Sequence, residues 1–148
     1  QPSQSDFRSL VEEILSLYRQ AHAEIRFDYS PDGVRDLYID RQQMRRALIN
    51  LIDNAVTAVL DEGGAVSVQT EFLPETGRAV IRVMDTGIGV PAGLREKIFE
   101  PYFSYGKKGM GLGLPIVKHI VEDHSGTITV EDNRPKGTVF RIELPVES

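Results

Sequence analysis

Cysteine is absent from this 148-residue chain, and its net charge is negative, at −5. The absence of cysteine excludes disulfide bonds, thiolate zinc sites and thiol nucleophiles. No apolar run approaches the ~18 residues of a membrane-spanning helix, and no signal peptide is recognisable. A net negative charge does not indicate nucleic-acid binding, which needs a basic surface. An acidic protein of this kind can bind a polyphosphate only with local positive charge or a metal ion.

The length of the chain is that of one domain, sufficient to bury a core without covalent cross-links. Hydrophobic residues make up 41% and charged residues 26% of it, which is typical of a globular protein. The chain begins with QPSQSDF and lacks an initiator Met. We therefore expect one domain over residues 1–148 that comes from a longer protein.

Several segments show helical spacing of apolar residues. The expected helices cover residues 5–18, 40–60, 94–99 and 112–124. Asp40 is the expected N-cap of the second helix, with Gln43 three residues later to complete a capping box. Gly126 is the expected C′ residue of the last helix.

Other segments alternate between apolar and polar residues and predict strands. The expected strands cover residues 25–29, 37–39, 66–72, 79–85, 127–132 and 138–145, with a turn at the SPDG of residues 30–33. The strand at 79–85 is apolar enough for the interior of a sheet. Because most strands fall in hairpin pairs while helices lie early and mid-chain, we expect an α+β fold. In such a fold, helices cover one face of a mixed sheet.

The helix at residues 40–60 carries a polar face opposite its apolar stripe. At 100° per residue, this face holds Asn50, Asp53, Asn54 and Thr57. A solvated surface would explain it, but Asn is a poor helix former and brings no benefit to an exposed helix centre. Two amide side chains one turn apart can instead coordinate a hard cation through their oxygens.

The segment MDTGIGVP follows the apolar strand directly. Asp85 ends the strand, so its carboxylate lies at an edge where ligand crevices often form, and it could accept a hydrogen bond from an amine such as adenine N6. Gly87 and Gly89 allow the backbone to approach a ligand closely. An ordinary turn is the alternative.

The segment GKKGMGLGLPIV at residues 106–117 combines glycines and lysines with the start of a helix. It matches neither the Walker pattern nor GxGxxG. The N–H groups of a helix N-terminus bind phosphate, Pro115 suits the first helical turn, and Lys107 and Lys108 could neutralise phosphate charge. A mobile surface loop with solvated lysines is the alternative.

Five motifs follow one another in order: LINLIDNA, DTGIGVP, IFEPYFS, GMGLGLPIV and KGTVFRIELP. This succession, from about Ile25 to Pro145, closely resembles the catalytic and ATP-binding domain of bacterial sensor histidine kinases, which has the Bergerat fold. That fold is a two-layer α/β sandwich with a mixed, mostly antiparallel sheet and a mobile ATP lid. IFEPYFS and GLGLPIVKHIVEDHSG look most like the nitrogen-regulation branch of these kinases.

The resemblance implies ATP and Mg²⁺ as ligands. Asn54 would bind the Mg²⁺ ion and Asn50 would lie near the phosphates and the metal, which makes both catalytic. Asp85 would accept a hydrogen bond from adenine N6, and Thr138 would support the same contact directly or through water.

The resemblance also implies further nucleotide contacts in these motifs and in a lid at about residues 90–111. They are Asp53, Thr57, Gly87, Gly89, Val90, Phe99, Tyr102, Phe103, Lys107, Lys108, Gly109, Met110, Gly111, Leu112, Gly113 and Leu114. Phe99, Pro101 and Phe103 would anchor the base of the lid, and the glycines of GMGLG would present backbone donors to the phosphates.

Asn50 separates a kinase from a hydrolase. Relatives that hydrolyse ATP carry a Glu there, which activates water as a general base, and an amide cannot accept that proton. The chain departs from the resembling family at Thr57, where a basic residue is common, and in the lid. There Tyr105, Gly106 and Met110 shift the lysines, so the identity of the γ-phosphate contact is open.

The phosphoacceptor histidine of the family lies on a separate dimerisation domain, upstream of the ATP-binding motifs. His22 precedes Ala-Glu-Ile-Arg and mimics that site, but a strand pattern follows it. His119 and His124 are expected at the surface or the end of their helix. Residues 1–22 are then a helix and linker from the missing domain, and the resemblance implies a response regulator as downstream partner. It also implies a homodimeric parent, a cytoplasmic location for this domain, and compatibility with an inner-membrane anchor elsewhere in the parent.

Two other functions remain open on the sequence. An anti-sigma-factor serine kinase uses the same fold but usually retains the Glu at the position of Asn50. A non-catalytic nucleotide-binding scaffold would explain the shifted lysines and Thr57.

Overall fold

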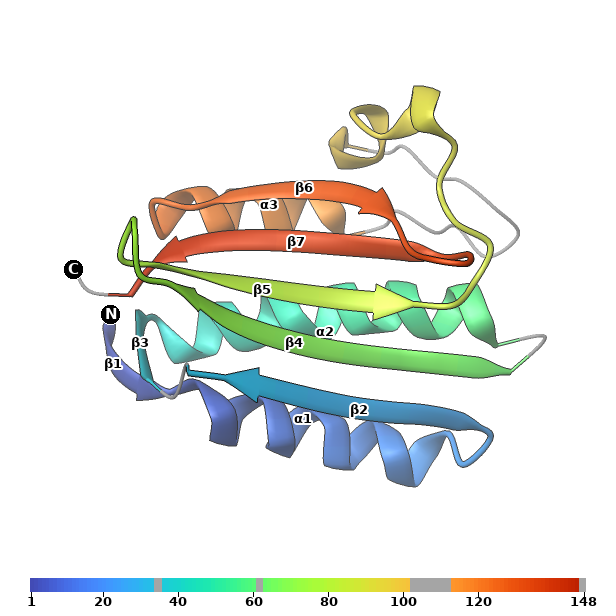
Figure 1. Cartoon of the computed structure of the whole chain (residues 1–148), viewed down its shortest axis with the longest axis horizontal. Helices are drawn as coiled ribbons and strands as arrows, with labels where there is room; N and C mark the ends of the chain where they lie inside the picture. The colour runs from blue at the N-terminus through green and yellow to red at the C-terminus, as the bar shows by residue number, and fades with distance from the viewer. Residues whose placement is uncertain (34–35, 61–62, 102–112, 147–148) are drawn as a thin grey trace.

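The computed structural model describes residues 1–33, 36–60, 63–101 and 113–146. Its centre is a five-stranded sheet in the order β2-β4-β5-β7-β6 (Figure 1). The strands are β2 (Ile25–Asp32), β4 (Gly64–Leu73), β5 (Arg78–Asp85), β6 (Thr127–Asp132) and β7 (Thr138–Pro145). Only the β2–β4 pair is parallel, so the sheet is mixed and mostly antiparallel.

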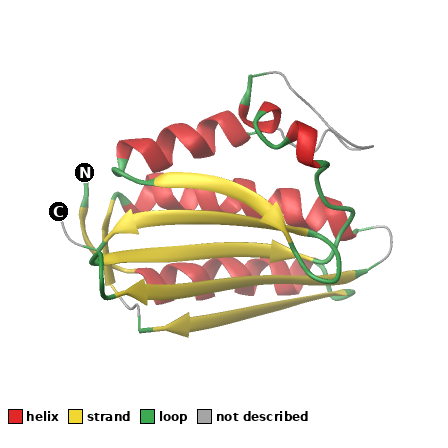
Figure 2. Ribbon diagram, turned by 45° about the horizontal axis from the view of Figure 1, so that its top comes forward, coloured by secondary structure: helices red, strands yellow, loops and turns green. Residues whose placement is uncertain are grey.

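Three helices lie on one face of this sheet (Figure 2). They are α1 (Phe7–Ala21), α2 (Arg41–Val59) and α3 (Leu114–Asp123). A small two-stranded sheet pairs β1 (Ser3–Asp6) with β3 (Asp36–Ile39) in antiparallel register. The predicted α+β architecture, with helices over one face of a mixed sheet, is therefore confirmed.

The core lies between the helices and the sheet, and the apolar stripes found in the sequence provide it. Phe7 and Leu10 of α1, Leu51 of α2 and Ile81 of β5 are all fully buried. β5, the strand predicted for the interior of a sheet, has two neighbouring strands on either side. Because α1 belongs to this core, residues 7–21 are an integral part of the domain.

The N-terminal part of the chain differs from the expected pattern in two places. β1 was not predicted, since SQSD is polar and has no alternation, and α1 begins at Phe7 with Asp6 as its N-cap, whose side chain accepts from the Ser9 N–H. The turn predicted at residues 30–33 is also wrong in part. β2 continues to Asp32 because Pro31 and Asp32 stay in register with β4.

The capping box predicted for α2 is only half formed. Asp40 caps the helix, accepting a hydrogen bond from the Gln43 N–H at 3.1 Å. The Asp40 N–H, which a capping box would give to Gln43, donates instead to Nε2 of His124 at 3.0 Å. A histidine at the end of α3 thus completes the cap of α2, and His124 is half-buried at its helix end.

The C-terminus of α3 departs by one residue from the prediction. Ser125, at φ +60°, takes the C′ position that was expected for Gly126. The Gly126 N–H bonds to the Val121 carbonyl and the Ser125 N–H to that of Glu122, which is the Schellman pattern. Gly126 is required for another reason, since a Cβ there would lie 2.5 Å from the Glu143 carbonyl oxygen of β7.

Two short 3₁₀ turns, η1 (Ala92–Leu94) and η2 (Lys97–Phe99), replace the single helix predicted for residues 94–99. The predicted start of the last helix is also early, because Gly113 precedes it as N-cap with a left-handed φ of 84°. Pro115 does lie in the first turn, as expected. Among the residues that the structure describes, no helix combines the length and apolarity that crossing a membrane requires.

Candidate functional site

The candidate site lies at the end of the sheet where β5 stops and β7 begins (Figure 1). Asp85, the last residue of β5, pairs in register with Thr138, the first of β7. The Asp85 side chain is 4% exposed, and its Oδ1 accepts a hydrogen bond from the Gly87 N–H at 2.8 Å. Burial raises the pKa of Asp85 to about 6, and backbone hydrogen bonds from Gly87 and Thr138 oppose that rise.

A second polar group lies beside this carboxylate. Thr138 is 2% exposed, and its hydroxyl oxygen is one of two buried side-chain atoms in the described part of the chain without a hydrogen-bond partner. A buried hydroxyl without a partner costs free energy unless a ligand or water satisfies it. The pair of Asp85 and Thr138 therefore offers a buried acceptor beside an unsatisfied hydroxyl.

The hairpin turn between β6 and β7 holds the Asp85 backbone in place. Nδ2 of Asn133 donates to the Asp85 carbonyl oxygen at 2.7 Å. Gly137, at φ +116°, passes so close that a Cβ there would lie 1.9 Å from the same oxygen. The strand end is thus fixed by a side chain and by a glycine that no other residue can replace.

α2 borders the site through its polar face. Asn54 is 8% exposed, and its Nδ2 donates to the Asn50 carbonyl oxygen at 3.0 Å. The backbone before α3 packs on the other asparagine, since a Cβ on Gly113 would lie 3.1 Å from the Asn50 side chain. Gly87 packs on the end of the same helix, 2.5 Å from the Ala58 carbonyl oxygen by the same measure. The end of β5, α2 and the start of α3 therefore meet here.

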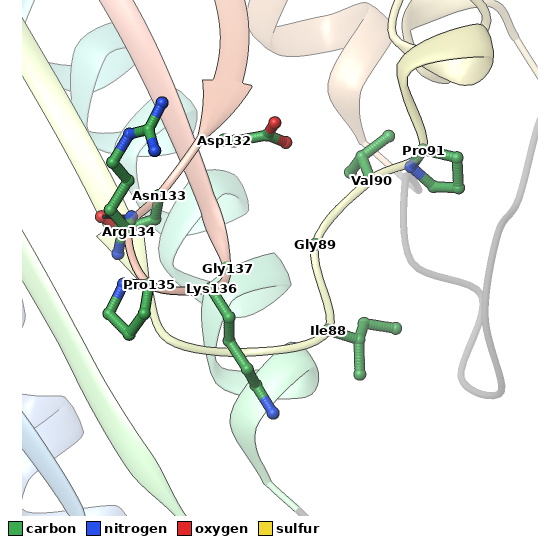
Figure 3. Close-up of a pocket in the computed structure, with 10 residues that line it drawn as sticks. All are labelled: Ile88, Gly89, Val90, Pro91, Asp132, Asn133, Arg134, Pro135, Lys136 and Gly137. Carbon is green, nitrogen blue, oxygen red and sulfur yellow. Dashed lines mark hydrogen bonds between the residues drawn. The ribbon is translucent and has the colours of Figure 1, made fainter.

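A cavity of about 410 Å³ adjoins this junction. Residues 88–91, which follow β5, face the hairpin turn of residues 132–137 across it (Figure 3). Val90 lines the cavity and is 8% exposed, whereas Ile88, which also lines it, is 58% exposed. Asp85, Thr138, Asn50 and Asn54 do not line it, whereas Asn133 does, so the cavity is a neighbour of the polar junction.

Comparison with protein families gives a match over residues 39–148, which include both asparagines, Asp85 and Thr138. The matching family is described as histidine kinase-, DNA gyrase B-, and HSP90-like ATPases. The chain belongs to this ATPase family. Its structure resembles the catalytic domain of histidine kinase ThkA with a TM-score of 0.88 and 31% identity, covering 99% of this chain and 97% of that domain. A mycobacterial sensor histidine kinase, MprB, gives a TM-score of 0.86 at 30% identity and covers 99% of both chains.

Two longer relatives are a sensor protein and a sensor histidine kinase. The C4-dicarboxylate transport sensor protein DctB of Rhizobium meliloti is 40% identical over 142 residues, which cover 93% of this chain and 22% of DctB. Sensor histidine kinase ZraS of Escherichia coli is 36% identical over 146 residues, covering 95% of this chain and 30% of ZraS. This ATPase domain therefore spans between a fifth and a third of these curated relatives.

The residues expected to contact the nucleotide lie in several parts of this ATPase domain. On α2, Asn54 donates to the Asn50 carbonyl oxygen, and Gly113 packs against the Asn50 side chain. The Gly87 N–H donates to Asp85, and Gly87 packs on Ala58 at the end of the same helix. The Asp53 carboxylate accepts a hydrogen bond from the Tyr18 hydroxyl of α1, and its contact with the nucleotide stays a prediction.

The remaining described residues lie around the junction. The Leu114 side chain is 1% exposed and belongs to the hydrophobic core. Thr57 is half-buried one turn beyond Asp53, and Gly89 packs 3.4 Å from the Gly137 carbonyl oxygen, measured from a Cβ built on Gly89.

The expected lid base is partly in view. The Phe99 ring lies edge-on to Phe140 with centroids 6.3 Å apart, and Lys118 Nζ lies 5.9 Å from the Phe99 centroid. Pro101 is exposed. Eight other residues expected to contact the nucleotide fall outside the described ranges. They are Tyr102, Phe103, Lys107, Lys108, Gly109, Met110, Gly111 and Leu112.

Two site residues escaped the sequence analysis. Asn133 and Gly137 were not among the expected site residues, yet both hold the Asp85 backbone. The signal that could have identified Gly137 is its place directly before Thr138 in KGT. Asn133 gave no such signal, because Asn is common in turns for local reasons.

The residues at the junction fit ATP. An ionised carboxylate accepts a hydrogen bond from an exocyclic amine, and a hydroxyl can donate or accept one. Gly87 and Gly113 keep the backbone on either side of the junction close to α2. In the described ranges, no three His, Asp or Glu side chains gather to hold a metal. A divalent cation here would depend on amide oxygens and on the phosphates themselves.

Proposed function

We propose that this domain binds Mg·ATP and transfers the γ-phosphoryl group to a histidine on a separate dimerisation domain of the parent protein. The observation that carries the proposal is the buried Asp85 carboxylate beside the partnerless Thr138 hydroxyl, at the same junction as Asn50 and Asn54. ATP binding itself follows from the family. The magnesium ion, the contacts of individual residues and the acceptor are parts of the proposal.

Adenine recognition falls to Asp85 and Thr138. The Asp85 carboxylate accepts a hydrogen bond from the N6 amine of the base. The Thr138 hydroxyl, which has no partner in the protein, forms a hydrogen bond with the base or with a bridging water. Burial makes this contact selective, because a base without an amine would leave the desolvated carboxylate without that partner. Gly87 and Gly89, which follow β5, have no side chain that would obstruct the flat adenine ring.

The phosphates and the metal fall to α2 and to the start of α3. Asn54 is the proposed Mg²⁺ ligand through its amide oxygen, and Asn50 lies one turn earlier on the same face. The first N–H groups of α3 face phosphate oxygens, and the lysines of the lid add positive charge. Bound magnesium would neutralise charge that develops on the transferred phosphoryl group.

The transfer needs a nucleophile, and among the described residues no histidine lies at the junction. Asn50 cannot take a proton from water, so hydrolysis lacks its general base. The bond between the γ-phosphorus and its bridging oxygen breaks as a ring nitrogen of the acceptor histidine bonds to phosphorus. ADP leaves and the imidazole loses its proton to solvent. The contribution of this domain is position and charge stabilisation.

Two partner proteins belong to the proposal. One is the dimerisation domain of a homodimeric parent, to which residues 1–22 lead. The other is a response regulator, which receives the phosphoryl group on an aspartate. Histidine kinase ThkA, whose structure was solved in complex with the response regulator protein TrrA, resembles this chain with a TM-score of 0.83 and 30% identity. A lid at about residues 90–111 and membership of the nitrogen-regulation branch are further parts of the proposal.

The test supplies the dimerisation domain of the parent together with ATP labelled on the γ-phosphate. Label on its histidine, dependent on Mg²⁺ and weakened by Asn54→Ala or Asp85→Asn, is expected. A folded domain that leaves that histidine unlabelled under Mg²⁺ refutes the kinase. Label on a protein serine would indicate the serine kinase, and calorimetry that shows ATP binding without any transfer would indicate a nucleotide-sensing scaffold.

A further inference from the structure

A hydrogen bond joins α1 to α2, the helix that carries Asn50 and Asn54. The proposed site does not use this bond. The Tyr18 hydroxyl of α1 donates to Oδ1 of Asp53. Asp53 lies between Asn50 and Asn54 on α2, one residue before the proposed metal ligand. The contact therefore joins the helix that carries both asparagines to a neighbour that lies outside the junction.

Tyr18 is held firmly enough to act as a fixed donor. Its ring lies 5.9 Å from that of Phe27 on β2 and stacks on His22 at 6.3 Å, measured between centroids. Arg19 fastens the same end of α1 to β2, donating to the Phe27 carbonyl oxygen from Nε at 3.2 Å and from Nη2 at 2.9 Å. The hydroxyl also stays protonated, because burial first, and then the Asp53 carboxylate, raise the pKa of Tyr18.

A second polar link joins the same helices at the far end of α2. Glu13 of α1 contacts Arg41 at 3.3 Å and Arg45 at 2.9 Å. These ion pairs are largely exposed, so solvent screens them, and they lie two turns or more from Asn54. The Tyr18–Asp53 bond, in contrast, reaches α2 in the helical turn between Asn50 and Asn54.

The position of Asp53 on α2 means that its bond to Tyr18 resists rotation of α2 about the helix axis. At 100° per residue, Asp53 is about 60° from Asn50 and about 100° from Asn54, on the flank of their face. Rotating α2 by about 10° would move a side-chain atom ~5–6 Å from the axis by about 1 Å. A displacement of that size matters where a ligand must meet several groups at once.

We propose that Tyr18 and Asp53 are positioning residues that fix the rotation of α2, so that Asn50 and Asn54 face Mg·ATP. The inference rests on the proposed function and deepens it. It differs from the expectation drawn from the sequence, in which Asp53 contacts the nucleotide directly. A direct contact needs the charge of Asp53 and makes Tyr18 dispensable, whereas positioning needs the hydrogen bond.

The chain offers a matched control for removing the hydroxyl. Tyr29 on β2 is also half-buried, and its hydroxyl lies 3.4 Å from that of Thr70 on β4. Tyr18→Phe and Tyr29→Phe remove the same atom from similar surroundings. Asp53→Asn keeps an acceptor for Tyr18 without the charge, and Asp53→Ala removes both.

Calorimetry with Mg·ATP on the folded variants tests the inference. Tyr18→Phe should weaken binding about three- to tenfold, and Tyr29→Phe should match the wild type. Asp53→Asn should recover at least half of the affinity lost in Asp53→Ala, and adding Tyr18→Phe to Asp53→Ala should cause no further loss. With the dimerisation domain present, Tyr18→Phe should raise the KM for ATP and leave kcat within about twofold.

The outcomes separate the inference from the function on which it rests. Wild-type binding with equal affinities for Tyr18→Phe and Tyr29→Phe overturns the positioning role alone. The same role is overturned if Asp53→Asn is as weak as Asp53→Ala while Tyr18→Phe binds normally, since Asp53 would then be a direct contact. A wild-type domain that binds no Mg·ATP overturns the proposed function and this inference together.

Discussion

The buried carboxylate of Asp85 makes a quantitative prediction about pH. Its pKa rises from 3.8 to about 6 on folding, because desolvation outweighs the hydrogen bonds from Gly87 and Thr138. The folded state therefore binds this proton more tightly than the unfolded state. The stability linked to it is greatest below pH 3.8 and is lost as the pH rises toward and through about 6.

The magnitude follows from the same values. A difference of about 2 in pKa corresponds to about 3 kcal/mol, most of which is lost between pH 4 and pH 7. For a domain of this size, that loss lowers the midpoint of thermal unfolding by roughly 6–12 °C. Asp85→Asn removes the titrating group and provides the reference, because the other titrating groups are common to both proteins.

The assay is urea unfolding of the ligand-free wild type and Asp85→Asn at a series of pH values. Relative to the variant, the wild type should lose about 2–3 kcal/mol of unfolding free energy between pH 4 and pH 7. ATP binding should change in the opposite direction, since the ionised form accepts the adenine amine. At pH 5 the wild-type advantage over Asp85→Asn should be roughly tenfold smaller than at pH 7. A stability difference that varies by less than about 0.5 kcal/mol over this range would refute the reasoning.

Two further substitutions test the packing and the metal contact. Gly87→Ala would place a Cβ 2.5 Å from the Ala58 carbonyl oxygen and should cost about 1–3 kcal/mol of stability. Gly93→Ala, with nothing within 4 Å of its Cβ, is the control, and equal thermal midpoints for the two would contradict the geometry. Asn54→Ala should remove the part of ATP affinity that depends on Mg²⁺, measured by calorimetry with and without the ion. An unchanged magnesium dependence would exclude Asn54 as the ligand.

Long periodic segments were predicted well because their signal is repeated. The apolar stripe of α2 and the run of β5 each involve many side chains that must face one core, so the period shows which face is buried. β1 has no such signal, since its four residues form a strand only by pairing with β3. The Ser125 left-handed turn was missed for a related reason. Glycine is the residue that the C′ position favours, but packing against Glu143 of β7, and not the helix end, requires a glycine at position 126.

The candidate site was predictable where its residues stand in motifs. Asp85, Asn50, Asn54 and Thr138 were all singled out. Asp85 pairs with Thr138 in the sheet, and Asn54 bonds to Asn50, against which the backbone before α3 packs. Their contacts with a nucleotide stay predictions. The contact of Asp53 with Tyr18 could not be foreseen. It joins residues 35 positions apart, and nothing in the helical period of either segment indicates which neighbour each helix meets.

His124 is not available as a phosphoacceptor while the domain is folded. Because a carbonyl only accepts, the contact of Nδ1 with the Ile120 carbonyl oxygen at 2.8 Å requires a proton on Nδ1. Nε2 then spends its lone pair on the Asp40 N–H. Both nitrogens of this imidazole are committed to joining two helices, so it is no nucleophile while the domain stays folded. If the acceptor histidine belongs to the dimerisation domain, as proposed, then supplying that domain as a separate polypeptide should make phosphoryl transfer second order overall, with a rate that rises in proportion to its concentration until saturation.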